Sequence, residues 1–438
     1  MGENKLKEQT YPEFNHTIVR GQLGNGMAVV LIPMKAFQKS YAVLTTDFGS
    51  IDQSFYSGPN REFVQLPAGC AHFLEHKLFE KEDHDAFDLF GKLGADSNAF
   101  TSYTQTSYQF STTMNLHQCL EILLDFVQKP YFSKEGVAKE QGIIGQEIRM
   151  YADSPISRLY TGTVANLYPH DPMRQDIAGS EDSIAQITPD VLYRAYNEFY
   201  RPSNLKLVVA GNIDPHQLFE WLEEQETQYS IDRAPLPQRA LKLSDPLDSD
   251  LVEQNQLMMD VQRPHVMVAL RGSHRPLDAP ARLKYRLSVE LLLEMLFDDT
   301  TDNFLRLYDR GILDDSFSFS FEMERGFHFA TWSTETNQPR KFTDEIRAIL
   351  QAAPDNLMHM KGQFAAMRRG AVGRLVASLN SPEMIANRYA SNLFGDITIY
   401  DELKQLQSLT LTDLQTALDQ FICPAMTTTF TIWPQAEH

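Results

Sequence analysis

The chain resembles itself weakly at an offset of about 218 residues. Leu78-Phe79 matches Leu296-Phe297, which lies 218 residues further along. The segment 93–100 resembles the segment 310–317 at an offset of 217 residues. Because the matches stay in order and the offset drifts by only a residue, they indicate an internal duplication. A chain built in this way is expected to fold as two related domains.

Apolar periodicity predicts the same kinds of element in both halves. The first half is expected to contain a hairpin over 22–34, strands over 40–48, 95–113 (two strands) and 205–210, and helices over 71–79, 85–93, 116–127, 133–150 and from Thr188 onward. The second half starts again with a strand over 266–270 and a helix over 283–297. Strands and helices mix without a Rossmann glycine pattern. The expected fold class is therefore α+β, each domain being a mostly antiparallel sheet flanked by helices.

The stretch 223–246 changes character, because it is polar, contains three prolines and has little periodicity. Such composition is typical of a connection between domains. We expect a first domain over 1–230, a linker over 231–260 and a homologous second domain over 261–438.

Composition narrows the classes of protein that the 438-residue chain can represent. The formal net charge of −19 argues against a nucleic-acid-binding protein. Three cysteines without paired spacing argue against a disulfide framework. Residues 1–12 are polar, and no apolar run is long enough to cross a membrane. We therefore expect a soluble protein of the cytoplasm that binds neither nucleic acid nor membranes.

The segment His72-Phe73-Leu74-Glu75-His76 concentrates two imidazoles and a carboxylate on an expected helix. On a helix, His72 and His76 stand four residues apart and project from one face. Two such histidines can bind one zinc ion, with Glu75 aimed at a metal-bound water. The order H-x-x-E-H is the inverzincin signature.

A catalytic zinc ion needs a third protein ligand. Glu80 continues the same helical face, but residues eight apart lie about 12 Å apart along a helix, too far to share one ion. The third ligand must therefore come from another element. The helix expected over 133–150 offers Glu135, Glu140 and Glu147.

These motifs together resemble the pitrilysin/insulinase/mitochondrial-processing-peptidase family of zinc peptidases. The similarity covers nearly the whole chain; its specific parts are the H-x-x-E-H segment, Asn98-Ala99-Phe100-Thr101, the pair Glu140 and Glu147, and a block from 187 to 214. The resemblance implies that His72, His76 and Glu147 bind zinc. It implies that Glu140 orients a ligand from the second shell. The length fits the half-length bacterial members, which are pairs of homologous α+β domains.

The chemistry that follows is hydrolysis of a peptide bond, with Glu75 as the base that takes a proton from water and then delivers it to the leaving amine. A peptide substrate must lie extended beside the site. The strand around 97–102 could accept it by strand addition. The resemblance implies the same strand, and the expected substrate-binding residues are Ser97, Asn98, Ala99 and Phe100.

One expected part of the family pattern is missing. Active half-length members carry an arginine and a tyrosine, seven residues apart, in the second domain, where they hold the oxyanion. Aligned on Gly311, these positions hold Leu307 and Asp314. The favoured explanation is a heterodimer in which a homologous subunit without zinc supplies the pair; the other is self-association with different residues.

A non-catalytic scaffold or regulatory subunit that keeps the peptidase fold is the alternative function. Such subunits usually have a degraded zinc motif, whereas His72, Glu75, His76, Glu140 and Glu147 are all present here. The second copy is different: at an offset of 218, the three residues of the motif meet Glu290, Leu293 and Glu294. The sequence therefore predicts one zinc site, in the first domain.

Overall fold

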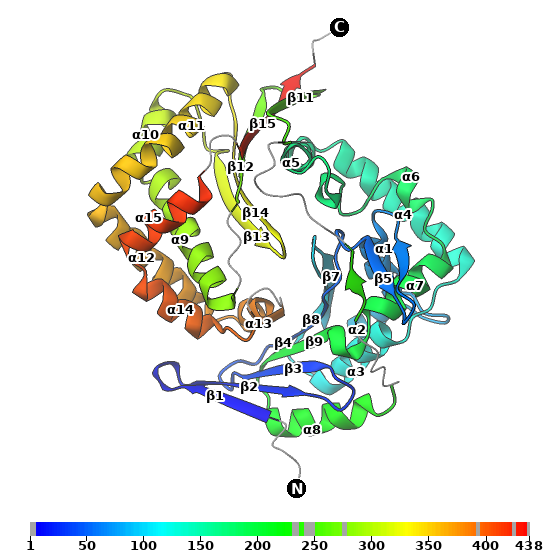
Figure 1. Ribbon diagram of the computed structural model, residues 1–438. Coiled ribbons are helices and arrows are strands. Elements are labelled where there is room, and N and C mark those ends of the chain that lie inside the picture. Colours follow the sequence, from blue (N-terminus) through cyan, green and yellow to red (C-terminus); the bar gives the residue numbers. More distant parts are fainter. Residues whose placement is uncertain are drawn as a thin grey trace.

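The fold is given by a computed structural model, which describes residues 6–229, 236–240, 250–273, 278–390, 395–422 and 426–435. Each half of the chain forms a sheet with helices packed against it. In Figure 1 the helices of the first half (mostly cyan) and those of the second half (yellow to red) lie on opposite sides, with strands of both sheets between them.

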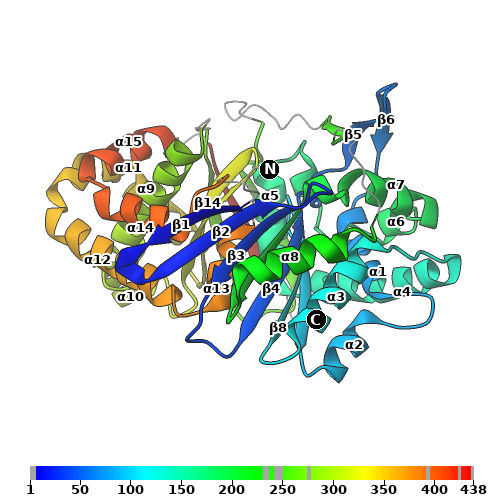
Figure 2. The ribbon, with the colours of Figure 1, turned by 90° about the horizontal axis from the view of Figure 1, so that it is seen from below.

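The first sheet has seven strands in the order β1-β2-β3-β9-β4-β8-β7, and Figure 2 shows β1 to β4 from below. The strands are β1 Leu6–Tyr11, β2 His16–Gln22, β3 Ala28–Pro33, β9 Leu205–Gly211, β4 Ser40–Thr46, β8 Thr106–Thr112 and β7 Asp96–Thr101. Neighbouring strands are antiparallel except β3 and β9, which are parallel. The predicted hairpin is confirmed: Gly26 takes a φ of +102° in the turn between β2 and β3, a conformation that favours glycine.

Helices cover one face of this sheet and build the first core. The helices of the first half are α1 Cys70–Phe79, α2 Ala86–Lys92, α3 Leu116–Gln128, α4 Lys134–Ala152, α5 Pro155–Leu167, α6 Glu181–Ile184, α7 Pro189–Phe199 and α8 Pro215–Glu226. Leu74 of α1, Leu120 of α3 and Leu222 of α8 are buried in one cluster with Val29 and Leu31 of β3. A small separate sheet has the order β10-β5-β6 (β10 Gln238–Arg239, β5 Ser54–Ser57 and β6 Glu62–Gln65).

The second sheet repeats the first. Its five strands, in the order β11-β15-β12-β14-β13, are β11 Gln254–Met259, β15 Thr427–Pro434, β12 His265–Arg271, β14 Phe327–Glu335 and β13 Ser318–Glu324. The pair β11–β15 is parallel and the other pairs are antiparallel, as in the series β3-β9-β4-β8-β7. The helices are α9 Ala279–Phe297, α10 Asp302–Asp309, α11 Pro339–Asn356, α12 Lys361–Ser378, α13 Pro382–Ala390, α14 Ile399–Ser408 and α15 Leu411–Phe421. The α+β fold with an internal duplication is confirmed.

Each half lends a helix to the other half. Helix α5 packs on β12 and β15 of the second sheet, where Leu159 is buried against Met267 and Phe430. Helix α13 packs on β4 and β9 of the first sheet, and its Ile385 shares a buried cluster with Val43. The two halves therefore complete each other's hydrophobic cores.

The predicted linker 231–260 falls partly outside the described residues. Within its described part, Gln254–Met259 is β11, whose register with β15 runs from Gln254–Thr429 to Met259–Pro434. The second sheet thus begins at Gln254 rather than after residue 260, because these residues, although polar, pair along their full length with β15.

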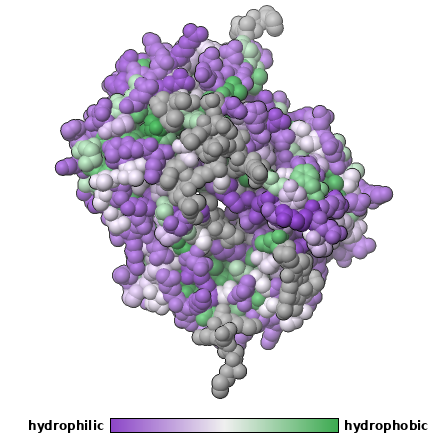
Figure 3. All heavy atoms as spheres, in the orientation of Figure 1, coloured by the Kyte–Doolittle hydropathy of each residue, from purple (hydrophilic) through white to green (hydrophobic). Residues whose placement is uncertain are grey.

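The surface is mainly polar. Hydrophilic residues dominate the face seen in Figure 3, and hydrophobic residues appear only in small groups. Among the described residues, no helix combines the length and the apolar character that crossing a membrane requires.

A buried carboxylate joins three distant segments. Asp52, whose side chain is fully buried, accepts a 2.7 Å hydrogen bond from Arg239 Nε in β10. Arg325, in the turn between β13 and β14, donates to the other oxygen of Asp52 at 2.8 Å. One carboxylate therefore holds a cation of the second half against the first.

Replacing Asp52 by Asn should lower the free energy of unfolding by about 3 kcal/mol, because two buried guanidinium groups lose their counter-charge. Urea denaturation measures the change. The control is Glu62→Gln in the exposed ion pair with Arg194, which should cost less than about 1 kcal/mol. Equal effects of the two substitutions would show that the buried cluster adds nothing to stability.

Candidate metal centre

Helix α1 presents the two histidines side by side. It begins after Gly69, which has a φ of +87° and lies so close to the backbone of Ala178 that a Cβ there would come within 2.4 Å of the Ala178 carbonyl oxygen. The rings of His72 and His76 lie 4.6 Å apart, centroid to centroid, as expected for residues one turn apart.

Helix α4 brings the carboxylates to α1. It begins at a cap, because the Ser133 hydroxyl accepts a hydrogen bond from the backbone N–H of Gly136. A Cβ on Gly136 would lie 2.8 Å from Lys77 Nζ of α1, so this glycine permits the close approach of the two helices. Two and nearly three turns further on, Glu140 and Glu147 face α1.

Three donor atoms converge between the two helices. His72 Nε2 lies 3.8 Å from Glu147 Oε1, and His76 Nε2 lies 3.7 Å from Glu147 Oε2. Donor atoms of all three residues lie within 4.8 Å of one another. Two imidazoles and a carboxylate at this separation fit a tetrahedral zinc ion with one open position, because bonds of about 2 Å place neighbouring ligand atoms slightly more than 3 Å apart.

Glu140 contacts His76 from behind. The hydrogen bond between His76 Nδ1 and Glu140 Oε1 is 3.0 Å long. Because a carboxylate only accepts, Nδ1 carries the proton and Nε2 is left with a free lone pair that faces Glu147. Nδ1 of His72, by contrast, is buried without a hydrogen-bond partner among the described residues.

The two histidines respond differently to their surroundings. Burial, and next the neighbouring His76, lower the pKa of His72 to about 3, so His72 is neutral at neutral pH. Burial also opposes charge on His76, but the hydrogen bond to Glu140 and the nearby carboxylates outweigh it and raise the pKa of His76. The carboxylates thus place negative charge where a cation would sit.

Glu75 is held beside the same cluster. Its side chain is almost fully buried, and one oxygen accepts a 2.6 Å hydrogen bond from the hydroxyl of Thr101. Burial raises the pKa of Glu75, although the bond from Thr101 opposes the shift. A carboxylate with a raised pKa is suited to take up and release a proton.

The expected substrate strand is β7, the outer strand of the first sheet. It packs beside α1 and pairs with β8 along one edge only. Ser97 and Ala99 are half-buried, whereas Asn98 and Phe100 are exposed. The free edge has the unpaired backbone groups that another extended chain would need.

The second half has an ion pair where the first half has the three donors. Counted from the first residue of each helix, Arg374 of α12 corresponds to Glu147 of α4, and Glu294 occupies the place of His76. Arg374 and Glu294 form a salt bridge. A fixed cation therefore takes the role that a metal ion would have between these helices.

The positions of the missing arginine and tyrosine hold side chains with other functions. Leu307 is buried in the second core. Asp314 pairs with Arg263 at 2.7 Å, and the nearby Arg306 pairs with Glu345 of α11 at 2.7 Å. None of these groups is free to hold an oxyanion.

Two polar residues at the site were not among the predicted site residues. Thr101 bonds Glu75, and Tyr151 follows Glu147 by one turn on α4. Burial, and next the charge of Glu147, raise the pKa of Tyr151. The spacing of four residues was the available signal for Tyr151; nothing local marked Thr101, because its contact depends on how β7 packs beside α1.

Comparison with known families agrees with this architecture. The family model "Insulinase (Peptidase family M16)" matches residues 62–180, and the model "Peptidase M16 inactive domain" matches residues 186–360. The chain is 39% identical over 433 residues to the uncharacterised zinc protease YmfH of Bacillus subtilis (strain 168), covering 98% of this chain and 100% of that protein.

Solved structures share the fold. An M16-like peptidase from Alicyclobacillus acidocaldarius matches with a TM-score of 0.90 and 27% identity, covering 99% of this chain and 100% of that one. The periplasmic protease PqqL from Escherichia coli matches with a TM-score of 0.69 and 17% identity, covering 100% of this chain but 48% of PqqL. The two matched models and the full-length relative show that the chain belongs to peptidase family M16.

Proposed function

We propose that the protein is a zinc metalloendopeptidase that hydrolyses peptides or unfolded segments. The observation that carries the proposal is the convergence of His72, His76 and Glu147 within 4.8 Å, with Glu75 buried beside them. The relatives' printed names include zinc proteases, in agreement with this choice of metal.

Each residue has a distinct part in the proposed reaction. His72, His76 and Glu147 hold the ion, which supplies Lewis acidity to a water molecule and to the peptide carbonyl. Glu75 accepts the proton of the attacking water and passes it to the leaving amine. Glu140 fixes the tautomer and ring orientation of His76 through the 3.0 Å hydrogen bond.

Substrate is proposed to add to the free edge of β7 as an extra strand. Backbone hydrogen bonds would then hold an extended peptide beside α1, with Ser97, Asn98, Ala99 and Phe100 in contact with it. A folded protein cannot offer such a strand. This supports a preference for peptides and unfolded segments.

The protein is proposed to work with a homologous subunit. Leu307 and the paired Asp314 leave the site without the arginine and tyrosine expected in active half-length members. A partner in a heterodimer would supply both groups. The scaffold alternative, and the expectation that the protein acts in the cytoplasm, remain to be tested by activity and by fractionation of cells.

Zinc binding is the first prediction. The purified chain should bind one zinc ion, and zinc at a hundred times its Kd should raise the free energy of unfolding by about 2.7 kcal/mol. His72→Ala and Glu147→Ala should abolish both effects, and Glu140→Gln should weaken binding by roughly 10- to 100-fold. His84→Ala, in an exposed loop, is the control. Unchanged metal content in the Glu147 variant would remove this residue from the site.

Removal of the base tests the reaction itself. Glu75→Gln should keep zinc but lower kcat by roughly 10²- to 10⁴-fold, because the amide cannot accept the proton. Cleavage of a quenched fluorescent peptide measures the loss, and exposed Glu82→Gln is the matched control. Turnover equal to that of the wild type would contradict the peptidase assignment.

Dependence on a partner gives a third prediction. The chain alone should cleave peptides slowly, and adding a homologous subunit that carries the arginine and tyrosine should raise kcat/KM at least about 100-fold, the range found for oxyanion donors. A partner with the arginine changed to Ala should give little increase. Full activity of the purified chain by itself would contradict the heterodimer.

A further inference from the structure

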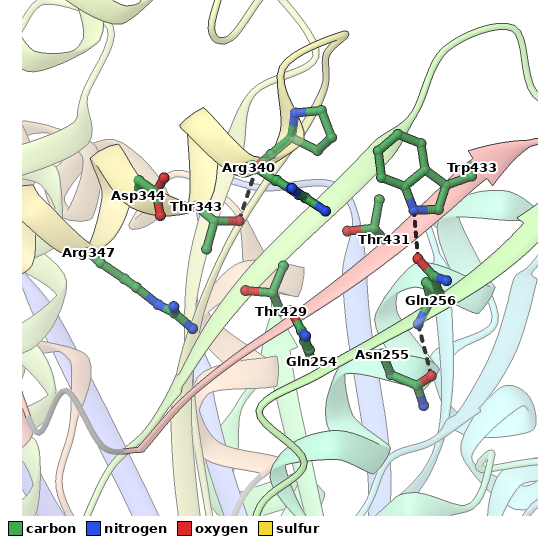
Figure 4. A pocket seen from close by; sticks show the side chains of 11 residues that line it. Gln254, Asn255, Gln256, Arg340, Thr343, Asp344, Arg347, Thr429, Thr431 and Trp433 are labelled. Carbon is green, nitrogen blue, oxygen red and sulfur yellow. Dashed lines mark hydrogen bonds between the residues drawn. The ribbon is translucent and has the colours of Figure 1, made fainter.

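A polar groove lies on the second sheet, outside the metal centre. It has a volume of about 640 Å³ and runs between α11 and the strands β11 and β15. Figure 4 shows Arg340 and Arg347 of α11 extending over the floor, which these strands form. A cavity of this size is typical of ligand sites.

The duplication explains why this groove exists. In the first half, α8 packs over β3, on a floor that includes Val29 and Leu31, with Leu207 and Val209 of β9 in the same buried cluster. Around the groove, the corresponding strands present polar side chains instead: Gln254, Gln256, Thr429 and Thr431. A polar floor does not favour an apolar helix, so this face suits a hydrophilic ligand.

The cations of the groove are unpaired. Neither Arg340 nor Arg347 has an ion pair or a hydrogen bond with another described residue, although Asp344 lies between them on α11. Nε of Arg347 is buried without a partner, and so is the hydroxyl of Thr429, a residue only 9% exposed. In a chain with a net charge of −19, two free arginines beside unsatisfied polar atoms indicate an anionic ligand.

The spacing of the arginines favours two separate anionic groups. Arg340 and Arg347 are seven residues apart, which on a helix is about 10.5 Å along the axis. A compact phosphate would need cations that converge on one point, whereas carboxylates along a peptide can each meet one guanidinium fork. The amides and hydroxyls of the floor can bond a peptide backbone, and the Trp433 indole, fixed by a 3.1 Å bond to Gln256, adds an apolar wall.

We propose that this groove binds an acidic peptide segment, two of whose carboxylates pair with Arg340 and Arg347. Asp344 weakens the interaction by repulsion and thereby sets its strength. The groove acts independently of the metal centre, so binding does not require peptide hydrolysis.

The test measures fluorescence anisotropy of labelled hexaglutamate with the full chain at low salt, using hexaglutamine as the neutral probe. Hexaglutamate should bind at least about tenfold more tightly than hexaglutamine. The double variant R340Q/R347Q should remove this difference, as expected for the loss of two charge-assisted pairs. The control K361Q/R369Q removes two exposed charges from α12 and should change affinity less than about twofold.

A second variant keeps the proposal testable if the double variant does not fold, which its thermal melting curve will show. Asp344→Asn should tighten hexaglutamate binding, a direction that a merely structural role of α11 would not give. Equal binding of hexaglutamine, equal losses in both double variants, or no tightening by Asp344→Asn would overturn the proposal. Displacement by inorganic tripolyphosphate at lower concentration than by hexaglutamate would also overturn it, in favour of a phosphate site.

Discussion

The close contact of α1 with α4 is the constraint on which the candidate site depends. Side chains of Lys77 and Glu80 reach so near to Gly136 that even a methyl group there would collide with them. Only this approach lets a carboxylate on one helix reach histidines on the other. The ring of His76 lies between Glu140, which bonds Nδ1, and Glu147, which faces Nε2. The geometry of the site therefore follows from helix packing rather than from a flexible loop, which is the arrangement that best preserves ligand geometry.

Much of this could be predicted from the sequence, for identifiable reasons. The helix that carries His72 and His76 has strong apolar periodicity, and α4 is marked by its Ser133 cap. The pairing of the two helices could not be derived from periodicity, because spacing along one helix contains no information about its neighbour. For that reason Glu135, Glu140 and Glu147 remained equal candidates until a family resemblance distinguished them.

The elements that were not predicted depend on distant partners. Helix α5 contains Thr161-Gly162-Thr163, residues of low helix propensity. Gly162 lies against the ring of Phe430, so close that a Cβ would come within 2.4 Å of it, and packing on the second sheet supports this helix. Strand β11 has the polar sequence QNQ at its start and resembles a linker, yet β15 pairs with it along its length. In both cases tertiary contacts override the local preference of the sequence.

The reciprocal placement of α5 and α13 has a consequence for the chain as a whole. Two copies of one fold that exchange the same helix form what would be a domain-swapped dimer if the copies were separate molecules. Here the copies belong to one polypeptide, so the exchange takes place within a single chain. Cutting the chain between the halves would leave each sheet without the helix that covers it. The cooperative folding unit is accordingly the entire pair, and neither half is a domain in the sense of a part that can stand alone.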